Sequence, residues 1–272
     1  MLSTSDLKIG FIGGGNMTKA IVGGITSSGA IAPDHIFVYD RHDDKLNLLR
    51  KKYCINTSKS DTDVIITCDI IFLAVKPQNF PNLLNEIKAA VSEQKIFVSI
   101  AAGISSQFIT DSVSCHCPVI RAMPNTPLLL GKGATAVSKT ENVSDEAFSV
   151  VKSLFACCGT VSVIEEKQMD AIVSVGGSSP AYVYLFVKAV VDSAVRQGID
   201  AATALEIICQ TLEGSVQMLK QSGYTPEELI KMVSTKGGTT AAAMDVFYKD
   251  NFEKMIDEAM EACTKRTKEL GC

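Results

Sequence analysis

The chain has 272 residues, of which 46% are hydrophobic and 21% charged, and its formal net charge is −4 at pH 7. This length and hydrophobic content allow one large or two ordinary globular domains with ample cores. The acidic balance, without any block of Lys and Arg, excludes the basic footprint of a protein that binds nucleic acid or an anionic membrane. The longest apolar stretch, residues 182–191, is interrupted by Lys188 and is too short to span a bilayer.

The expected location is the cytoplasm. The first ten residues contain neither the basic nor the hydrophobic segment of an export signal, and the nine cysteines include no Cys-x-x-Cys pair, which fits a reducing compartment. Cys115, His116 and Cys117 lie closer together in sequence than the ligands of the usual zinc chelate, so we expect no metal site there.

A strand, a glycine turn and a helix are predicted first. An apolar run over residues 9–12 precedes Gly13–Gly15, and helical spacing follows. Glycine lets the backbone turn sharply beside a pyrophosphate, and the helix start offers free N–H groups to that anion. The pattern predicts a dinucleotide-binding turn, although a plain strand-to-helix turn also uses glycine. Thr18 replaces the third glycine of the G-x-G-x-x-G fingerprint, so we expect slightly wider packing of the helix on the strand.

The second predicted strand, residues 36–39, ends at Asp40 and Arg41. An acidic residue at this point of a dinucleotide-binding unit takes the ribose hydroxyls and repels a 2′-phosphate, whereas Arg41 would hold that phosphate. The alternative role of Asp40 is that of a helix cap or turn residue. The sequence leaves the choice between NADH and NADPH open.

Strands and helices then alternate, which predicts a doubly wound α/β domain. Ligands of such sheets lie at the carboxyl ends of the strands, so Ala74–Pro77 and Ala101–Gly103 are expected to form pocket walls. Met123–Pro127 reads as a stiff, non-helical turn. The remaining elements are helices over residues 45–52 and 145–156, and strands near residue 55 and over 70–75, 96–100, 119–122, 134–137 and 160–163.

From Met169 onward only helices are predicted, which places the domain boundary between residues 1–165 and 166–272. The predicted helices span residues 180–197, 200–222, 225–233, 240–248 and 252–270. The first of these is apolar nearly all round and needs burial from several sides. We therefore expect it to interlock with a second copy of the chain.

The catalytic residues of several other reaction classes are missing. The sequence has no G-x-S-x-G elbow, no Walker lysine and no H-E-x-x-H, and its three histidines all fall in the first domain. Hydride transfer is the default chemistry of a dinucleotide turn. A second glycine turn, within Val233–Thr240, precedes a helix and suits a substrate carboxylate, although it also reads as a turn with a Thr N-cap.

Six motifs together resemble, in order, the blocks of the pyrroline-5-carboxylate reductases. They are GFIGGGNM (Gly10–Met17), AVKP (Ala74–Pro77), SIAAGI (Ser99–Ile104), RAMPNTP (Arg121–Pro127), SSPAY (Ser178–Tyr182) and STKGGTT (Ser234–Thr240). The resemblance implies reduction of a cyclic imine, 1-pyrroline-5-carboxylate, to L-proline with NADPH or NADH. It also implies a Rossmann-type doubly wound sheet followed by an all-helical dimerisation domain, with a homodimer assembled further into a ring.

The resemblance also implies site residues. The cofactor set is Gly13, Gly15, Asn16 and Met17 at the pyrophosphate, Asp40 and Arg41 at the ribose, and Ala74, Val75, Lys76, Pro77, Ala101, Ala102 and Asn125 around the nicotinamide half. The substrate set is Ser178, Gly237, Gly238, Thr239 and Thr240, of which Thr240 is the expected catalytic residue beside the imine nitrogen. Thr240 or a water relays the proton. Orientation supplies much of the catalysis because an imine accepts hydride readily.

Four positions depart from the family pattern, namely Asp40, Gly176, Ser179 and Lys236. They bear on cofactor preference and substrate affinity more than on reaction type. Two alternatives remain open. One is a β-hydroxyacid-dehydrogenase relative or another imine reductase, although Lys188, the only Lys of the long interdomain helix, reads as an i, i+4 partner of Asp192. The other is a non-catalytic dinucleotide-binding scaffold.

Overall fold

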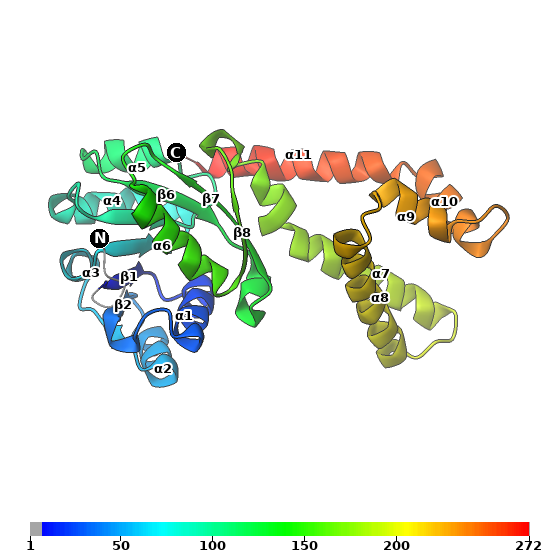
Figure 1. Cartoon of the computed structure of the whole chain (residues 1–272), viewed down its shortest axis with the longest axis horizontal. Coiled ribbons are helices and arrows are strands. Elements are labelled where there is room, and N and C mark those ends of the chain that lie inside the picture. The colour runs from blue at the N-terminus through cyan, green and yellow to red at the C-terminus, as the bar shows by residue number, and fades with distance from the viewer. Residues whose placement is uncertain (1–6, 272) are drawn as a thin grey trace. The chain divides into compact units, whose positions relative to one another are not determined.

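The computed structural model describes residues 7–271 (Figure 1). Residues 1–6, which form most of the segment where we expect no export signal, lie outside the described residues, as does residue 272. Among the described residues, no helix is both long and apolar enough to cross a membrane.

Eight strands form a single sheet in the order β3-β2-β1-β4-β5-β6-β7-β8. All neighbouring pairs are parallel except β6 and β7. The chain leaves β1 in one direction across the sheet, to β2 and β3, and returns to its other side at β4. Ligands of such sheets bind at this reversal point. The strands are β1 Ile9–Ile12, β2 Ile36–Tyr39, β3 Asn56–Thr57, β4 Ile70–Leu73, β5 Ile96–Ser99, β6 Val119–Met123, β7 Gly133–Lys139 and β8 Gly159–Val163.

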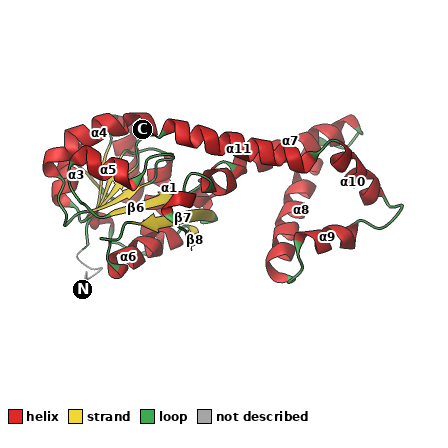
Figure 2. Cartoon of the chain, turned by 90° about the horizontal axis from the view of Figure 1, so that it is seen from above, coloured by secondary structure: helices red, strands yellow, loops and turns green. Residues whose placement is uncertain are grey.

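Helices cover both faces of the sheet, which confirms the predicted doubly wound fold (Figure 2). One core cluster joins the sheet to α1 (Asn16–Ser28), α2 (Asp43–Tyr53) and α6 (Asp145–Ala156). The other joins it to α3 (Asp61–Thr67), α4 (Phe80–Ile87) and α5 (Ser106–Val113). In the first cluster the rings of Phe11 and Phe72 stack at 4.5 Å, and Phe155 packs edge-on at 5.8 Å.

Two local features differ from the sequence prediction. The segment after Met123 is not wholly non-helical, because Thr126–Leu130 form a 3₁₀ helix, η4, with Pro127 in its first turn. Proline is compatible with a helix start because the N–H that it lacks has no partner there. The buried Thr18 also has a positive role, since its hydroxyl donates a hydrogen bond to Gly13 O at 2.5 Å.

The elements from Glu166 to Leu270 are all helical, as predicted. They begin with the short turn η5 (Glu166–Gln168) and a π-helix, η6 (Val173–Gly177), followed by α7 Ser179–Arg196, α8 Ala201–Gln221, α9 Pro226–Val233, α10 Thr239–Lys249 and α11 Phe252–Leu270. The predicted N-caps are present. Asp200 accepts from the N–H groups of Ala202 and Thr203, and Thr225 and Glu228 form a capping box.

By internal contacts the chain divides into two compact units. The first runs to Pro180 and also includes the chain from Ala262 onward, and the second is Ala181–Glu261. This division lies about 15 residues later than the domain boundary expected near residue 165, because the π-helix packs on β6 and β7 and Glu166 of η5 pairs with Arg121 of β6.

Candidate functional site

The glycine loop after β1 has the geometry of an anion site. Gly13 has φ +108°, and a Cβ there would lie 2.6 Å from Ala74 O, so only glycine fits. Gly15 is the N-cap of α1, and no side chain caps this helix. A Cβ at Gly15 would meet no atom within 4 Å. The first N–H groups of α1 therefore face open space, which is what a bound pyrophosphate requires.

The Asp40 carboxylate holds this loop in place. Its Oδ2 accepts from Gly14 N at 2.8 Å and its Oδ1 from His42 N at 2.9 Å, while Lys45 Nζ lies 3.2 Å from both oxygens. Burial on its own would raise the pKa of Asp40, but these hydrogen bonds outweigh it and hold the pKa below its usual value. Asp40 thus has the turn-forming role that the sequence left open, and the cofactor role stays a prediction.

A pocket of about 370 Å³ opens at the carboxyl ends of β1, β2 and β4. Seven of the predicted cofactor residues line it, namely Gly13, Gly15, Asp40, Arg41, Ala74, Val75 and Lys76. Asn16 and Met17 begin α1, and Pro77 begins the 3₁₀ helix η2 (Pro77–Asn79), each close in sequence to a lining residue. The prediction missed other lining residues, which are Tyr39, His42, Lys45, Asp61, Asn79 and Leu83.

The other predicted nicotinamide residues lie outside this pocket. Ala101 is buried in the second core cluster, and Ala102 packs against a small cluster around Met123. Asn125 donates from Nδ2 to Gly176 O at 3.1 Å and accepts at Oδ1 from Ala134 N at 2.9 Å. Asn125 therefore joins β7 to the π-helix.

The predicted substrate residues fall in both compact units. Ser178 belongs to the first, where its Oγ lies 3.3 Å from Cys263 Sγ. Gly237, Gly238, Thr239 and Thr240 belong to the second. Gly237 has φ +78° and Gly238 is the N-cap of α10, a helix that no side chain caps. The predicted glycine turn before a helix is therefore present, and its role as a second anion site stays a prediction. The residues that line the pocket of the glycine loop all belong to the first unit.

Comparison with known proteins decides the family. The family model "Pyrroline-5-carboxylate reductase dimerisation" matches residues 166–270, and "NADP oxidoreductase coenzyme F420-dependent" matches residues 8–103. The pyrroline-5-carboxylate reductase of Escherichia coli is 39% identical over 97% of this chain and 98% of that protein. The chain belongs to the pyrroline-5-carboxylate reductase family.

Solved structures of the family have the same fold. The Plasmodium falciparum pyrroline carboxylate reductase, whose structure has NADP bound, superposes with a TM-score of 0.91 at 30% identity and covers 99% of this chain and 100% of that one. The Coxiella burnetii pyrroline-5-carboxylate reductase superposes with a TM-score of 0.89 at 31% identity, over 99% and 100% of the two chains. The resemblance stated from the six motifs, and the fold it implied, are confirmed.

Arg121, from the RAMPNTP motif of this family, is a structural residue that the sequence prediction did not assign. Its side chain is buried, and its guanidinium lies 3.3 Å from Glu166 and 3.2 Å from Asp170. Glu166 also accepts from the N–H and the hydroxyl of Ser106. This cluster connects β6 and the start of α5 to η5. The sequence signal that could have revealed it is an Arg within an apolar strand, since a buried charge needs a partner.

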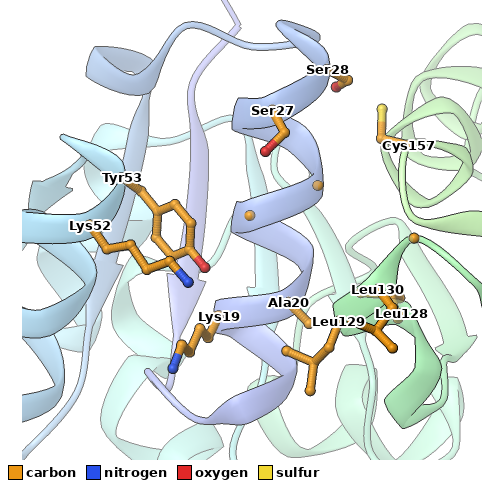
Figure 3. Close-up of a pocket in the computed structure, with 13 residues that line it drawn as sticks. Lys19, Ala20, Ser27, Ser28, Lys52, Tyr53, Leu128, Leu129, Leu130 and Cys157 are labelled. Atoms are coloured by element: carbon orange, nitrogen blue, oxygen red, sulfur yellow. The ribbon is translucent and has the colours of Figure 1, made fainter.

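A second and larger hollow, of about 630 Å³, runs along the flank of α1 (Figure 3). Leu128, Leu129 and Leu130 of η4 form one wall, and Lys19, Lys52 and Tyr53 lie on the other side (Figure 3). None of the predicted cofactor or substrate residues lines it. The glycine loop at the start of α1 therefore remains the candidate site of this family member.

Proposed function

We propose that the chain reduces 1-pyrroline-5-carboxylate to L-proline with NADPH or NADH, the last step of proline biosynthesis. The near-full-length similarity to the Escherichia coli reductase carries this proposal. The open space at Gly15 and the two uncapped helix starts, at α1 and α10, support it, because cofactor pyrophosphate and substrate carboxylate are both anions.

The cofactor half of the proposed site belongs to the first unit. The N–H groups of Asn16 and Met17 bind the pyrophosphate, and Ala74–Pro77, Ala101 and Ala102 flank the nicotinamide, with Asn125 holding the neighbouring backbone. When bound, the cofactor supplies the hydride.

The substrate half has Gly237, Gly238 and Thr239 as N–H donors to the carboxylate, and Ser178 as a further contact. Thr240, or a water that it holds, passes the proton to the imine nitrogen. A protonated imine accepts hydride readily, so the chain mainly orients the two reactants and needs no histidine in this half.

The active form is proposed to be a homodimer, with dimers assembled into a ring. Every residue of α7 is described and none is buried, although the helix carries Val183, Tyr184, Leu185 and Phe186. Apolar surface of this extent needs a partner. Residues 166–272 form the proposed dimerisation domain, a range that the matched dimerisation model nearly spans, and residues 1–165 the cofactor domain. The proposed compartment is the cytoplasm, where the eight described cysteines remain free thiols.

Steady-state oxidation of NADPH and NADH, with and without 1-pyrroline-5-carboxylate, tests the proposal. Oxidation that depends on the substrate, with proline as product, is the expected result. Thr240→Val is the matched variant, because it removes the hydroxyl at nearly constant volume and should lower kcat. Absence of substrate-dependent oxidation with either cofactor would refute the proposed activity.

A further inference from the structure

Two carboxylates line the pocket beside the glycine loop, and they differ in how many of their acceptor sites are already occupied by protein hydrogen bonds. An ionised carboxylate has about four lone-pair sites. The Asp40 carboxylate already accepts four hydrogen bonds, from Gly14 N, His42 N and twice from Lys45 Nζ. It can take a hydroxyl of a ligand only by giving up one of the bonds that shape the loop.

Asp61 is the other carboxylate. It is the first residue of α3, it lines the same pocket, and it is half-buried. Among residues 7–271, Asp61 forms no ion pair, and its carboxylate accepts a hydrogen bond from its own backbone N–H. It lines the pocket without a cation to occupy its other acceptor sites. A half-buried acceptor of this kind is costly unless a ligand satisfies it.

The charges around Asp61 come from two places in the fold, the segment that follows β2 and helix α4. Asp40 and Arg41 follow β2, and Glu86 lies on α4 and holds the Arg41 guanidinium at 3.2 Å. Burial raises the pKa of Asp61 to about 6, and the charges of Glu86 and Asp40 add to this while Arg41 opposes it. Asp61 is therefore mostly ionised at pH 7.5, and Arg41 is already paired with a carboxylate.

We propose that Asp61, rather than Asp40, is the carboxylate that accepts the adenosine ribose hydroxyls of the cofactor and selects NADH over NADPH. The inference rests on the proposed function only in that the pocket holds a nicotinamide dinucleotide. The two ribose hydroxyls donate to the Asp61 carboxylate, which lines the same pocket as Tyr39 and Asp40 at the end of β2, where the ribose of such cofactors lies. A 2′-phosphate brings about two negative charges to a pocket lined by Asp61 and Asp40, whose negative potential the charge of Glu86 strengthens.

The test uses two ligands that lack the nicotinamide, ADP-ribose and 2′-phospho-ADP-ribose, titrated into the full chain at pH 7.5 by calorimetry. The unchanged protein should bind ADP-ribose more tightly. Asp61→Asn keeps the shape but removes the charge, and should shift the ratio of the two Kd values toward the phosphorylated ligand by about tenfold or more, as expected for the loss of a charged hydrogen bond. A preference of the unchanged protein for 2′-phospho-ADP-ribose would overturn the proposal.

Asp63→Asn is the matched control. Asp63 lies on the same helix and accepts from Lys59 N, outside the pocket, so this variant loses the same charge and should change the ratio less than twofold. Asp40→Asn should weaken both ligands alike, because it loosens the glycine loop. The proposal fails if Asp61→Asn leaves the ratio unchanged, or if either of the other variants moves the ratio as far. Because no substrate is present, this outcome is independent of whether the chain reduces pyrroline-5-carboxylate.

Discussion

Gly15 shows how a single missing side chain defines the anion site. Its φ of −74° and ψ of −174° are accessible to any residue, and no protein atom lies within 4 Å of a Cβ there. Gly15→Val should therefore fold with an unchanged Tm and yet raise the Kd for NADH at least about tenfold, since its methyl groups fill the space of the pyrophosphate. Nicotinamide fluorescence measures the affinity, and Gly15→Ala should give a smaller loss. Unchanged binding by the valine variant would mean that the loop is only a turn.

Asp61 also carries a prediction about stability that needs no ligand. Burial first, and then the charge of Glu86, raise its pKa to about 6 from 3.8, so the folded state holds the proton more tightly than the unfolded state. Protonation of Asp61 therefore adds to the free energy of unfolding. This contribution is complete below about pH 4 and is lost as the pH rises through about 6. Asp61→Asn should therefore stabilise the ligand-free chain at pH 8 by about 1 kcal/mol, after screening at this half-exposed site is counted, and leave it unchanged at pH 3.5. Urea unfolding at both pH values checks this, and an equal effect at both would contradict it.

At the scale of elements, the Arg121 cluster is expected to hold β6, α5 and η5 together. Removing this buried guanidinium leaves the Glu166 and Asp170 carboxylates without their cation. Arg121→Leu should lower the free energy of unfolding by about 3 kcal/mol. Arg41→Leu is the control, because the ion pair of Arg41 with Glu86 is exposed and worth less than about 1 kcal/mol. Urea unfolding measures both variants. An equal decrease in the free energy of unfolding would show that burial does not make the Arg121 cluster more stabilising than an exposed ion pair.

The sequence predicted apolar strands and long or sharply capped helices well, and short helices poorly. All eight strands and the capping box at Thr225 were foreseen, because apolar runs and caps are local signals. Helices α3, α4 and α5 were not assigned, since each has only seven or eight residues, too few to show a period. For α3 and α5 the signal was the cap instead, because Ser60 and Ser105 each accept an N–H bond at the helix start.

For the site, the motifs located the glycine loop and the loop after β4, because glycine turns and strand ends can be recognised from the local sequence. They did not reveal Asp61, which lies far along the chain from both loops and enters the pocket only because α3 packs beside β1 and β2. Nor did they show that Asp40 is saturated by hydrogen bonds, which depends on the path of the backbone at Gly14 and His42. Tertiary placement, and not residue type, decides both points.

At the scale of the whole molecule, we predict that two chains share the proposed site. The glycine loop and the Gly237–Thr240 turn belong to different units, and α7 exposes apolar side chains that a second copy would cover. If the turn of one chain serves the cofactor held by the other, then Gly15→Val and Thr240→Val damage opposite halves of each shared site. A mixed dimer of the two inactive variants then has one intact site and one doubly damaged site.

Co-expression of these two variants with different affinity tags, followed by sequential purification, yields the mixed dimers. Their kcat per dimer should return to about half that of the unchanged protein, because one of the two composite sites is whole. Each variant purified alone should stay far less active than the mixed dimer, which controls for residual activity and for subunit exchange. Mixed dimers that form but remain inactive would show that each chain carries its complete site. The apolar face of α7 would then serve assembly alone, and the two anion-binding helix starts would have to meet within one chain.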